Sequence, residues 1–250
     1  MERLDGKKII ITGGTSGMGE GVVRAFPALG AKVVFWGRNT AAGEIARETG
    51  ATFVKADVSD KASVDEAMKK SVELLGGVDV LIHAAGVGPH CPAEKISLDD
   101  WINTMSINAT GTFLTNEAVF PYMKENGGNI LNFTSASAFI NSPGQAHYAA
   151  SKGAVNCWSR TIAKEWMQYN IRVNMIAPCI ATPMYAQMRA MMTPQQLAVH
   201  DADMAKLCIG GKMGDMERDF VPVMAFMASD GSRFMTGQTI SVDGGIMMVR

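Results

Sequence analysis

The stretch from Ile9 to Gly19, which reads IIITGGTSGMG, decides the fold of this chain. Its three β-branched apolar residues predict a buried strand, the glycines that follow predict a tight turn, and a helical pattern begins at Glu20. Glycines let a backbone approach a phosphate closely, and the free N–H groups at the start of a helix attract an anion. The spacing G-x-x-x-G-x-G differs from the G-x-G-x-x-G fingerprint, so the prediction of a phosphate-binding turn depends on the flanking strand and helix.

Short runs of β-branched and apolar residues recur along the chain, with helix-length segments between them. The runs are nearly continuously hydrophobic, as expected of strands that helices cover on both faces of a parallel sheet. They are Lys8 to Thr12, Lys32 to Trp36, Thr52 to Lys55, Val78 to His83, Asn129 to Thr134, Arg172 to Ile176 and Thr239 to Val242. The alternation predicts an α/β fold, a doubly wound Rossmann-type parallel sheet of about seven strands with helices on both faces. No repeat or Pro/Ser-rich linker divides the sequence, so residues 1–250 are expected to form a single domain.

The segment from Thr182 to Asp215 interrupts this alternation. It has no strand pattern and is rich in methionine. Methionine side chains are flexible and polarizable, so such a segment suits a lid that closes on an apolar ligand. We therefore expect residues 182–215 to form a substrate-binding lid within the domain, with ordinary helix packing as the alternative.

The composition excludes several classes of partner. The chain has 250 residues, and its 23 Lys and Arg residues against 24 Asp and Glu residues give a formal net charge of −1. Nucleic acids and anionic membrane surfaces need an excess or a concentrated stripe of basic residues, so neither is an expected partner. The polar start lacks the apolar core of a secretory signal, and the longest apolar runs fall short of the roughly 18 residues of a membrane helix. The expected partner is a small molecule.

The cysteines give no sign of a metal site or a disulfide framework. Cys91, Cys157, Cys179 and Cys208 contain no C-x-x-C pair, and no histidines cluster near them. Zinc sites and disulfide scaffolds both need closer or more regular spacings. Reduced thiols are typical of the cytoplasm, so we expect a cytoplasmic protein with no metal ligand.

The end of the second predicted strand bears on the choice of cofactor. In folds of this type, an acidic residue there binds the free 2′-hydroxyl of the adenosine ribose of NAD. This chain reads Phe35-Trp36-Gly37-Arg38-Asn39 at that point, without a carboxylate. The Arg38 guanidinium can pair with a 2′-phosphate, so the sequence favours NADP(H) over NAD(H). The alternative is a solvated surface arginine, which would leave NAD(H) as a cofactor.

The second half of the chain carries Ser135, Tyr148 and Lys152. Tyr148 and Lys152 are four residues apart, which places them on one face of a helix. A tyrosine with an ordinary pKa of about 10 is a poor base at neutral pH, but a neighbouring ammonium favours its phenolate. Together with the glycine turn, this pair makes the chain resemble the short-chain dehydrogenase/reductase family, from about Lys7 to about Met248.

Further motifs carry the same resemblance. Thr12 to Gly19 fits the family's T-G-x-x-x-G-x-G, Asp57-Val58 fits the pair beside the adenine, and Asn108 fits the active-site asparagine. Asn174 to Pro178 resembles the N-x-x-x-P stretch beside the nicotinamide, and Thr182 matches the residue that contacts the carboxamide. The resemblance implies an oxidoreductase that transfers a hydride between NADP(H) and a secondary alcohol or ketone.

The resemblance also implies roles for individual residues. Tyr148 would be the general acid/base, and Ser135 would hydrogen-bond the substrate oxygen. Lys152 would lower the pKa of Tyr148 and hold the nicotinamide ribose, while Asn108 would position a water of the proton relay. The implied cofactor-binding residues are Gly13, Thr15, Ser16, Gly17, Met18, Gly19, Gly37, Arg38, Asp57, Val58, Ala84, Ala85, Gly86, Asn108, Tyr148, Lys152, Pro178, Ile180 and Thr182. The expected substrate contacts are Ser135, Gln145, Tyr148, Met184 and Met188.

Three positions, in two motifs, depart from the family's pattern. The N-N-A-G motif after the fourth strand reads His83-Ala84-Ala85-Gly86 here, so we expect His83 to replace in part the asparagines that brace the sheet. Cys179 stands where a glycine usually follows the proline, and it is expected to be a wall residue near the nicotinamide. Family resemblance further implies a homotetramer, built largely from the helices that contain Asn108 and Tyr148.

The expected substrate pocket has a largely apolar lining. Arg189 and Lys206 are expected to face solvent, so no cluster of cations is available to hold a carboxylate or phosphate. This favours a bulky hydrophobic substrate such as a hydroxysteroid or bile acid. One alternative is a 3-oxoacyl-thioester reductase, which would need a basic surface patch for an acidic carrier. The other is a non-catalytic dinucleotide-binding sensor, against which the four catalytic positions argue.

Overall fold

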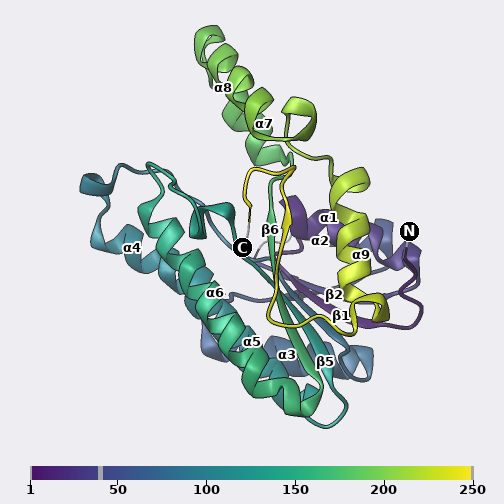
Figure 1. Cartoon of the computed structure of the whole chain (residues 1–250). Coiled ribbons are helices and arrows are strands. Elements are labelled where there is room, and N and C mark those ends of the chain that lie inside the picture. Colours follow the sequence, from purple (N-terminus) through teal and green to yellow (C-terminus); the bar gives the residue numbers. More distant parts are fainter. Residues whose placement is uncertain (1, 39–41, 249–250) are drawn as a thin grey trace.

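The computed structural model describes residues 2–38 and 42–248, apart from the side chain of Met184. Within these residues a seven-stranded sheet has the order β3-β2-β1-β4-β5-β6-β7, and each pair of neighbours is parallel (Figure 1). The strands are β1 (Lys8–Thr12), β2 (Lys32–Gly37), β3 (Thr52–Lys55), β4 (Val80–His83), β5 (Gly128–Phe133), β6 (Ile171–Pro178) and β7 (Thr239–Val242). The predicted α/β fold with a doubly wound parallel sheet is confirmed.

The helices cover both faces of the sheet. They are α1 (Gly17–Ala25), α2 (Ala42–Thr49), α3 (Lys61–Leu75), α4 (Leu98–Met105), α5 (Gly111–Met123), α6 (Ala146–Trp166), α7 (Pro183–Ala190), α8 (Pro194–Leu207) and α9 (Val221–Ala228). Figure 1 shows α1, α2 and α9 on one side of the sheet and α3, α5 and α6 on the other. A hydrophobic core lies on each face of the sheet, because successive side chains of a strand point to opposite faces. In β1, Ile9 and Ile11 are buried toward the first group of helices and Ile10 is buried toward the second.

The predicted strands match the observed ones closely, with differences at their ends. β4 begins at Val80 rather than Val78, because Gly76 and Gly77 both have positive φ angles and the chain needs two further residues to enter the sheet. β6 extends to Pro178, since Pro178 still pairs with Val242 of β7. These changes leave the order of the elements as predicted.

The chain order reverses between β1 and β4, and this point positions the candidate site. β1 pairs with β2 on one side and with β4 on the other. In open α/β sheets, ligands bind at the carboxyl ends of the strands next to such a reversal. The residues that follow β1 and β4, from Gly13 and from Ala84 onward, therefore meet at one edge of the sheet.

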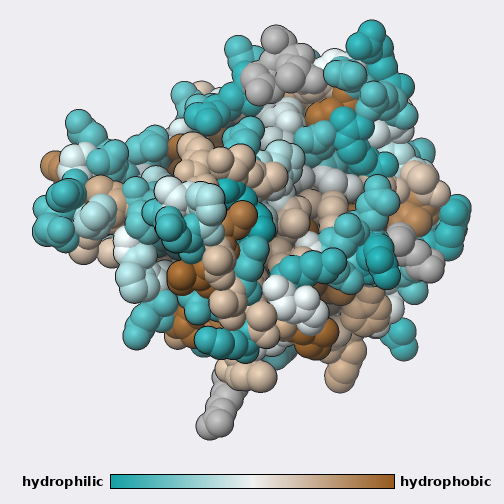
Figure 2. Space-filling model, turned by 90° about the horizontal axis from the view of Figure 1, so that it is seen from above, coloured by the Kyte–Doolittle hydropathy of each residue, from teal (hydrophilic) through white to brown (hydrophobic). Residues whose placement is uncertain are grey.

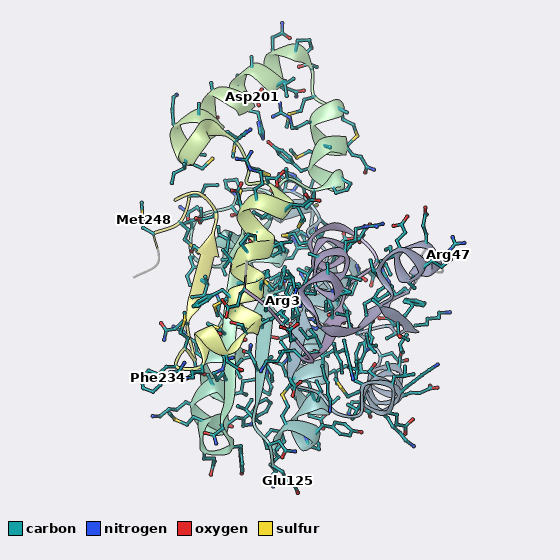
Figure 3. All side chains as sticks on the ribbon, turned by 90° about the vertical axis from the view of Figure 1, so that its right-hand side faces the viewer. Arg3, Arg47, Glu125, Asp201, Phe234 and Met248 are labelled. Atoms are coloured by element: carbon teal, nitrogen blue, oxygen red, sulfur yellow. The ribbon has the colours of Figure 1, made fainter. Side chains whose placement is uncertain are left out.

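Residues 182–215, here called the arm, contain α7 and α8 and extend beyond the sheet at the end of β6 (Figure 1). The Arg189 side chain is 31% exposed, so it faces solvent in part, as expected, but it is paired. Its guanidinium forms a bidentate ion pair with Asp201, in which Nη2 lies 3.0 Å from Oδ2. Figure 3 places Asp201 on the arm, at the opposite end of the molecule from Glu125. The pair joins α7 to α8, a contact between residues 12 positions apart.

No helix in the described ranges is both long and apolar enough to cross a bilayer.

Candidate active site

The turn after β1 leaves its backbone open for a close approach. Gly13 has a φ angle of 67°, and a Cβ atom there would lie 2.7 Å from the Cα atom of Ala85. A Cβ atom on Gly19 would collide with the carbonyl oxygen of Gly13. The N-cap residue of α1, Ser16, makes no side-chain capping bond, so its hydroxyl is available beside the first N–H groups of the helix. This arrangement has the features of an anion-binding helix start.

A cavity of about 120 Å³ lies between this turn, the end of β2 and the chain after β4. Its lining contains nine of the residues expected to hold a cofactor: Gly13, Thr15, Ser16, Gly37, Arg38, Asp57, Val58, Ala85 and Gly86. It also contains Trp36, Ala56, Val87 and Ile107, which the sequence analysis missed. Each of these four residues is the direct sequence neighbour of an expected cofactor-binding residue. This adjacency was the only sign in the sequence that they line the cavity.

A second cavity, of about 480 Å³, shares Arg38, Ala56 and Asp57 with the first. Arg38 is exposed where the two cavities meet. The pKa of Asp57 is lowered mainly by hydrogen bonds from Ser59 and, to a smaller extent, by the charge of Arg38. The Arg38 guanidinium therefore lies near the predicted adenosine end of the site.

Other expected cofactor residues lie outside this lining. Gly17, Met18 and Gly19 begin α1, and the Met18 side chain packs against the core. Ile180 is also buried in the core, so its backbone, and not its side chain, is what could contact a ligand. Thr182 caps α7, because its hydroxyl accepts a 3.3 Å bond from the N–H of Tyr185.

Asn108 is fixed by three hydrogen bonds. It lies in a π-helical turn, Ser106–Thr110, and is fully buried. Its Oδ1 accepts from the N–H of Val87 at 2.8 Å, and its Nδ2 donates to the carbonyl oxygen of Val87 at 2.9 Å and to Ser151 Oγ at 2.9 Å. The side chain therefore ties the chain after β4 to α6, and it has no N–H donor left for a ligand.

Ser135 and Tyr148 are neighbours in space. Ser135 lies two residues after β5, and Tyr148 lies in the first turn of α6. Burial raises the pKa of Tyr148, while a hydrogen bond with Ser135 acts in the opposite direction. The ring of Tyr148 also faces Gly88, where a Cβ atom would lie 3.6 Å from Cε2. Ser135 accepts a 3.2 Å bond from the N–H of Ser137, so its hydroxyl proton is free to point toward the phenol or a ligand.

Lys152 lies one helical turn after Tyr148 on α6 and is almost completely buried. Its Nζ donates a 2.8 Å hydrogen bond to the carbonyl oxygen of Phe133 and lies 5.9 Å from the centroid of the Tyr148 ring. Burial lowers the pKa of Lys152 to about 8. The expected lowering of the Tyr148 pKa by Lys152 is not found in this structure, because desolvation dominates at both side chains.

His83, the last residue of β4, joins the last residue of β1 to α5. It is fully buried, and its Nδ1 lies 3.1 Å from Thr12 Oγ1 and 2.9 Å from Thr115 Oγ1. Thr12 Oγ1 in turn accepts a 3.2 Å bond from the N–H of Ala85. Burial, with a smaller contribution from the Lys152 charge, lowers the pKa of His83 to about 3. His83 is therefore neutral at pH 7 and holds Thr12, next to the glycine turn.

The expected substrate contacts are only partly brought together. Gln145 precedes α6, and its Oε1 lies 3.5 Å from Ser137 Oγ, two residues after Ser135. Met188 is on α7 of the arm and is exposed, and the side chain of Met184 lies outside the described residues. Gln145 is therefore close to Ser135, whereas Met188 lies on the exposed surface of the arm. Cys179 follows β6 and is half-buried.

Comparisons with known proteins agree with this geometry. A family model described as Enoyl-(Acyl carrier protein) reductase matches residues 13–247. A 3-oxoacyl-[acyl-carrier-protein] reductase of Chlamydia pneumoniae is 36% identical, over 97% of this chain and 98% of the relative. This chain belongs to the short-chain dehydrogenase/reductase family. It is an NAD(P)-dependent oxidoreductase.

Other relatives have different named activities. A glucose 1-dehydrogenase of Gluconobacter oxydans is 33% identical, over 99% of this chain and 94% of the relative. The solved structure of a short-chain type dehydrogenase/reductase from Mycobacterium ulcerans superposes with a TM-score of 0.88 at 26% identity, covering 98% of this chain and 90% of that one. The reductase of Chlamydia pneumoniae and the glucose dehydrogenase are thus named for different substrates.

The described residues fit a nicotinamide dinucleotide. The test is the turn itself: a side chain at Gly13 would collide with Ala85, and one at Gly19 would collide with the carbonyl oxygen of Gly13, so only glycines allow this close-packed backbone. Gly37 is also in a position that has no space for a side chain, because a Cβ atom there would lie 2.7 Å from Thr15 Oγ1. The N–H groups at the start of α1 would hold the pyrophosphate, and Asp57 and Val58, which line the smaller cavity, would contact the adenine.

Proposed function

We propose that this protein catalyses NADP(H)-dependent interconversion of a secondary alcohol and a ketone on a bulky, apolar substrate. The observation that carries the proposal is the placement of Ser135 beside Tyr148, with the buried ammonium of Lys152 below the tyrosine ring. A bound NADP(H) would supply or accept the hydride. The protein's contribution is then to bind the substrate oxygen and to move its proton.

The proton-transfer roles follow from the contacts of each side chain. Ser135 would donate a hydrogen bond to the substrate oxygen, because its hydroxyl already accepts from the N–H of Ser137. Tyr148 would give its proton to that oxygen during reduction, and the raised pKa of its phenol keeps it protonated for this step at neutral pH. Asn108 positions the chain after β4 rather than a ligand atom, since Val87 and Ser151 use its side chain.

Arg38 supports NADP(H) as the preferred cofactor. It lines both cavities at the adenosine end, and Gly37 beside it carries no carboxylate that would repel a 2′-phosphate. The larger cavity also contains Lys55 and Lys70, together with Asp57 and Glu66, so its lining has three cations and two anions. A small excess of positive charge favours the more anionic of the two cofactors.

The apolar surface near the site supports a bulky hydrophobic substrate. Phe139 and Ile140 are exposed in the segment between Ser135 and Tyr148, and Met188 and Met191 are exposed on the arm. Figure 2, seen from the side on which the arm lies, shows hydrophobic residues in separate patches among hydrophilic ones. The narrower expectation of a hydroxysteroid or bile acid gains no support from the relatives described above.

A second candidate is a 3-oxoacyl-thioester reductase, which the similarity to the reductase of Chlamydia pneumoniae favours. A thioester on an acidic carrier would require basic residues near the site. Arg189 cannot provide that charge freely, because Asp201 already pairs with it. This candidate therefore ranks second.

We also propose that the arm acts as the lid over this substrate. The proposal is supported by its exposed methionines and by its position after β6, next to the site. Limited proteolysis near Met191 should slow when cofactor and substrate are both bound. Equal cleavage with and without ligands would contradict a lid.

A homotetramer is the proposed assembly, built through α5 and α6. Phe113 and Tyr122 on α5 are each 41% exposed, and Phe113 packs edge-to-face on Trp158 of α6, with ring centroids 5.2 Å apart. Exposed aromatic residues of this kind are typical of interfaces between chains. Light scattering should give the mass of four chains, and a monomer would contradict the proposal. A cytoplasmic location stays a prediction, based on the four free cysteines.

The proposed function is tested by following the absorbance of the reduced nicotinamide. The purified protein is mixed with NADPH or NADH and a panel of bulky cyclic ketones, steroid ketones and 3-oxoacyl thioesters. We expect oxidation of NADPH with apolar ketones and much slower oxidation with NADH. Turnover confined to thioesters would favour the second candidate. Cofactor binding without turnover on any member of the panel would contradict the proposed function and favour a sensor.

A further inference from the structure

Two cysteines lie at the base of the arm, one in each of the segments that connect it to the sheet. Cys179 is the first residue after β6, and Cys208 is the C-cap residue of α8. The two segments contact each other through their backbones. Gly214 donates a 3.0 Å hydrogen bond to the carbonyl oxygen of Cys179, and Ala181 donates a 2.9 Å bond to the carbonyl oxygen of Gly214. The arm therefore begins and ends at one place.

The last residue of β7 and the two residues after it hold both cysteines at the base of the arm. The N–H of Cys179 donates a 2.9 Å bond to the carbonyl oxygen of Val242. Two residues later, the carbonyl oxygen of Gly244 accepts a 2.9 Å bond from Ile209, the neighbour of Cys208. A Cβ atom on Gly244 would lie 2.9 Å from Cβ of Cys208, so this backbone lies directly against the second cysteine. The backbones at both cysteines are thus held by one three-residue stretch.

The surroundings of the two thiols differ. Cys179 is half-buried, and its pKa is raised to about 11 by burial and then by the nearby Cys208 and Asp243. The Sγ of Cys208 lies at the end of a helix, 3.2 Å from the carbonyl oxygen of Lys212. Both thiols are half-buried, and because the pKa of Cys179 is raised, we expect Cys179 to react second.

We propose that Cys179 and Cys208 are an oxidisable thiol pair, which a low-molecular-weight disulfide converts into a disulfide bond across the base of the arm. None of the catalytic roles proposed above uses either thiol. The new bond would close a loop that contains all of α7 and α8. Because it would join the two segments from which the arm extends, it would limit how far the arm can move relative to β6.

The reaction is a thiol–disulfide exchange in two steps. Cys208 loses its proton and attacks one sulfur of the reagent, whose S–S bond breaks, and the first reagent thiol leaves with a proton. Cys179 then loses its proton, its sulfur attacks the sulfur of Cys208 in the mixed disulfide, and the second reagent thiol leaves. The two protein thiols lose two electrons in total, and the reagent gains two electrons as it becomes two thiols. The raised pKa of Cys179 makes the second step faster at alkaline pH.

The experiment uses oxidised glutathione as the reagent and the full-length Cys157→Ser variant as the starting protein. Cys157 is exposed on α6, so its removal prevents adducts that are unrelated to the proposal. After oxidation and denaturation, thiols are counted and intact masses measured, and peptides are mapped without reduction. We expect the variant to lose two of its three thiols, with a mass lower by two hydrogen atoms and a peptide pair that joins Cys179 to Cys208. Added reductant should restore all three thiols.

Second-site variants locate the bond. Adding Cys179→Ser should leave a glutathione adduct on Cys208 that does not resolve, and adding Cys208→Ser should leave no internal disulfide. Adding Cys91→Ser is the matched control and should still allow the pair to form. The proposal is overturned if the starting variant keeps all its thiols, or if the mapped disulfide contains Cys91. It does not rest on the proposed function, so thiol counts and masses decide it whatever the enzyme's substrate.

Limited proteolysis then tests whether the disulfide restrains the arm. Cleavage near Met191 should be at least about threefold slower in the oxidised protein than in the reduced protein, because a disulfide restricts the loop that it closes. The Cys179→Ser form should lose this difference. Equal cleavage of the oxidised and reduced proteins, with the disulfide present by mapping, would overturn the claim that the bond restrains the arm.

Discussion

The Nζ atom of Lys152 donates a 2.8 Å hydrogen bond to the carbonyl oxygen of Phe133, the last residue of β5 and two positions before Ser135. This bond connects the catalytic helix α6 to the strand that carries the serine. The bond gives the buried ammonium a hydrogen-bond partner. Burial removes the ammonium from water, and this desolvation lowers the pKa of Lys152 to about 8. Lys152 is therefore partly uncharged in mildly alkaline solution before any ligand binds.

Replacement of Lys152 by methionine should separate its chemical role from its packing. Methionine fills a similar volume but has no charge and no donor for Phe133. We expect kcat to fall about 100-fold or more, because the variant has no ammonium to hold the nicotinamide ribose beside Tyr148. Thermal unfolding should shift by only a few degrees, since the variant no longer buries a charged group. A kcat within a factor of about two of the wild-type value would contradict the role given to Lys152.

Replacement of Arg38 by aspartate should reverse the cofactor preference. A carboxylate there repels a 2′-phosphate and can accept from a free 2′-hydroxyl. Dissociation constants for NADPH and NADH, measured by fluorescence titration, should show NADPH weakened by more than about tenfold and NADH unchanged or tightened. Arg47→Asp is the control, because Arg47 is exposed on α2 and lines neither cavity. A variant that still prefers NADPH would show that Arg38 does not select the cofactor.

His83 should make stability depend on acid pH. Its pKa is about 3 in the folded protein, against an ordinary value of 6.5. Between these values the unfolded chain binds a proton that the folded chain does not, so the free energy of unfolding decreases as the pH falls. One such proton is worth about 1.4 kcal/mol per pH unit.

The His83→Asn variant measures this contribution. Asparagine can still bond Thr12 or Thr115 but does not titrate. Urea unfolding at pH 6.5 and pH 5 should show the wild-type protein losing about 2 kcal/mol more than the variant between the two conditions. Equal losses in both proteins would mean that His83 is not the buried neutral group described here.

The ion pair of Arg189 with Asp201 should matter more for the arm than for the whole fold. Both side chains are partly exposed, so the pair adds little to global stability. Arg189→Met should leave the unfolding temperature nearly unchanged but raise KM several-fold and speed proteolysis near Met191. Lys206→Met, also on the arm, is the control and should change neither. Unchanged KM and proteolysis in Arg189→Met would show that the pair does not hold α7 to α8.

The strands and the helix that carries Tyr148 and Lys152 could be predicted from the sequence because local patterns specify them. Ile9 to Ile11 are buried on both faces of a parallel sheet, which requires a continuous apolar run, and Tyr148 and Lys152 share a helix face because of their spacing alone. The pairing of Arg189 with Asp201 could not be predicted, since it depends on how two helices of the arm fold back on each other. The π-helical turn around Asn108, which directs that side chain toward Val87, has no local signal either.

Desolvation is the other effect that the sequence did not reveal. A lysine four residues from a tyrosine predicts a lowered phenol pKa, but burial raises the pKa of Tyr148 and lowers that of Lys152 in this structure. The sequence identifies both side chains but not the depth at which each lies. The same limit applies to His83, whose neutral state follows from its complete burial.

The central claim is that Tyr148 transfers the proton while the other residues bind and position. The most direct test compares the wild-type protein with Tyr148→Phe in NADPH oxidation by an apolar ketone, with the dissociation constant for NADPH measured alongside. We predict that kcat falls by about 1,000-fold or more while NADPH binds within about threefold as tightly, because phenylalanine keeps the ring and removes only the hydroxyl. Near-full turnover in the phenylalanine variant would contradict the account.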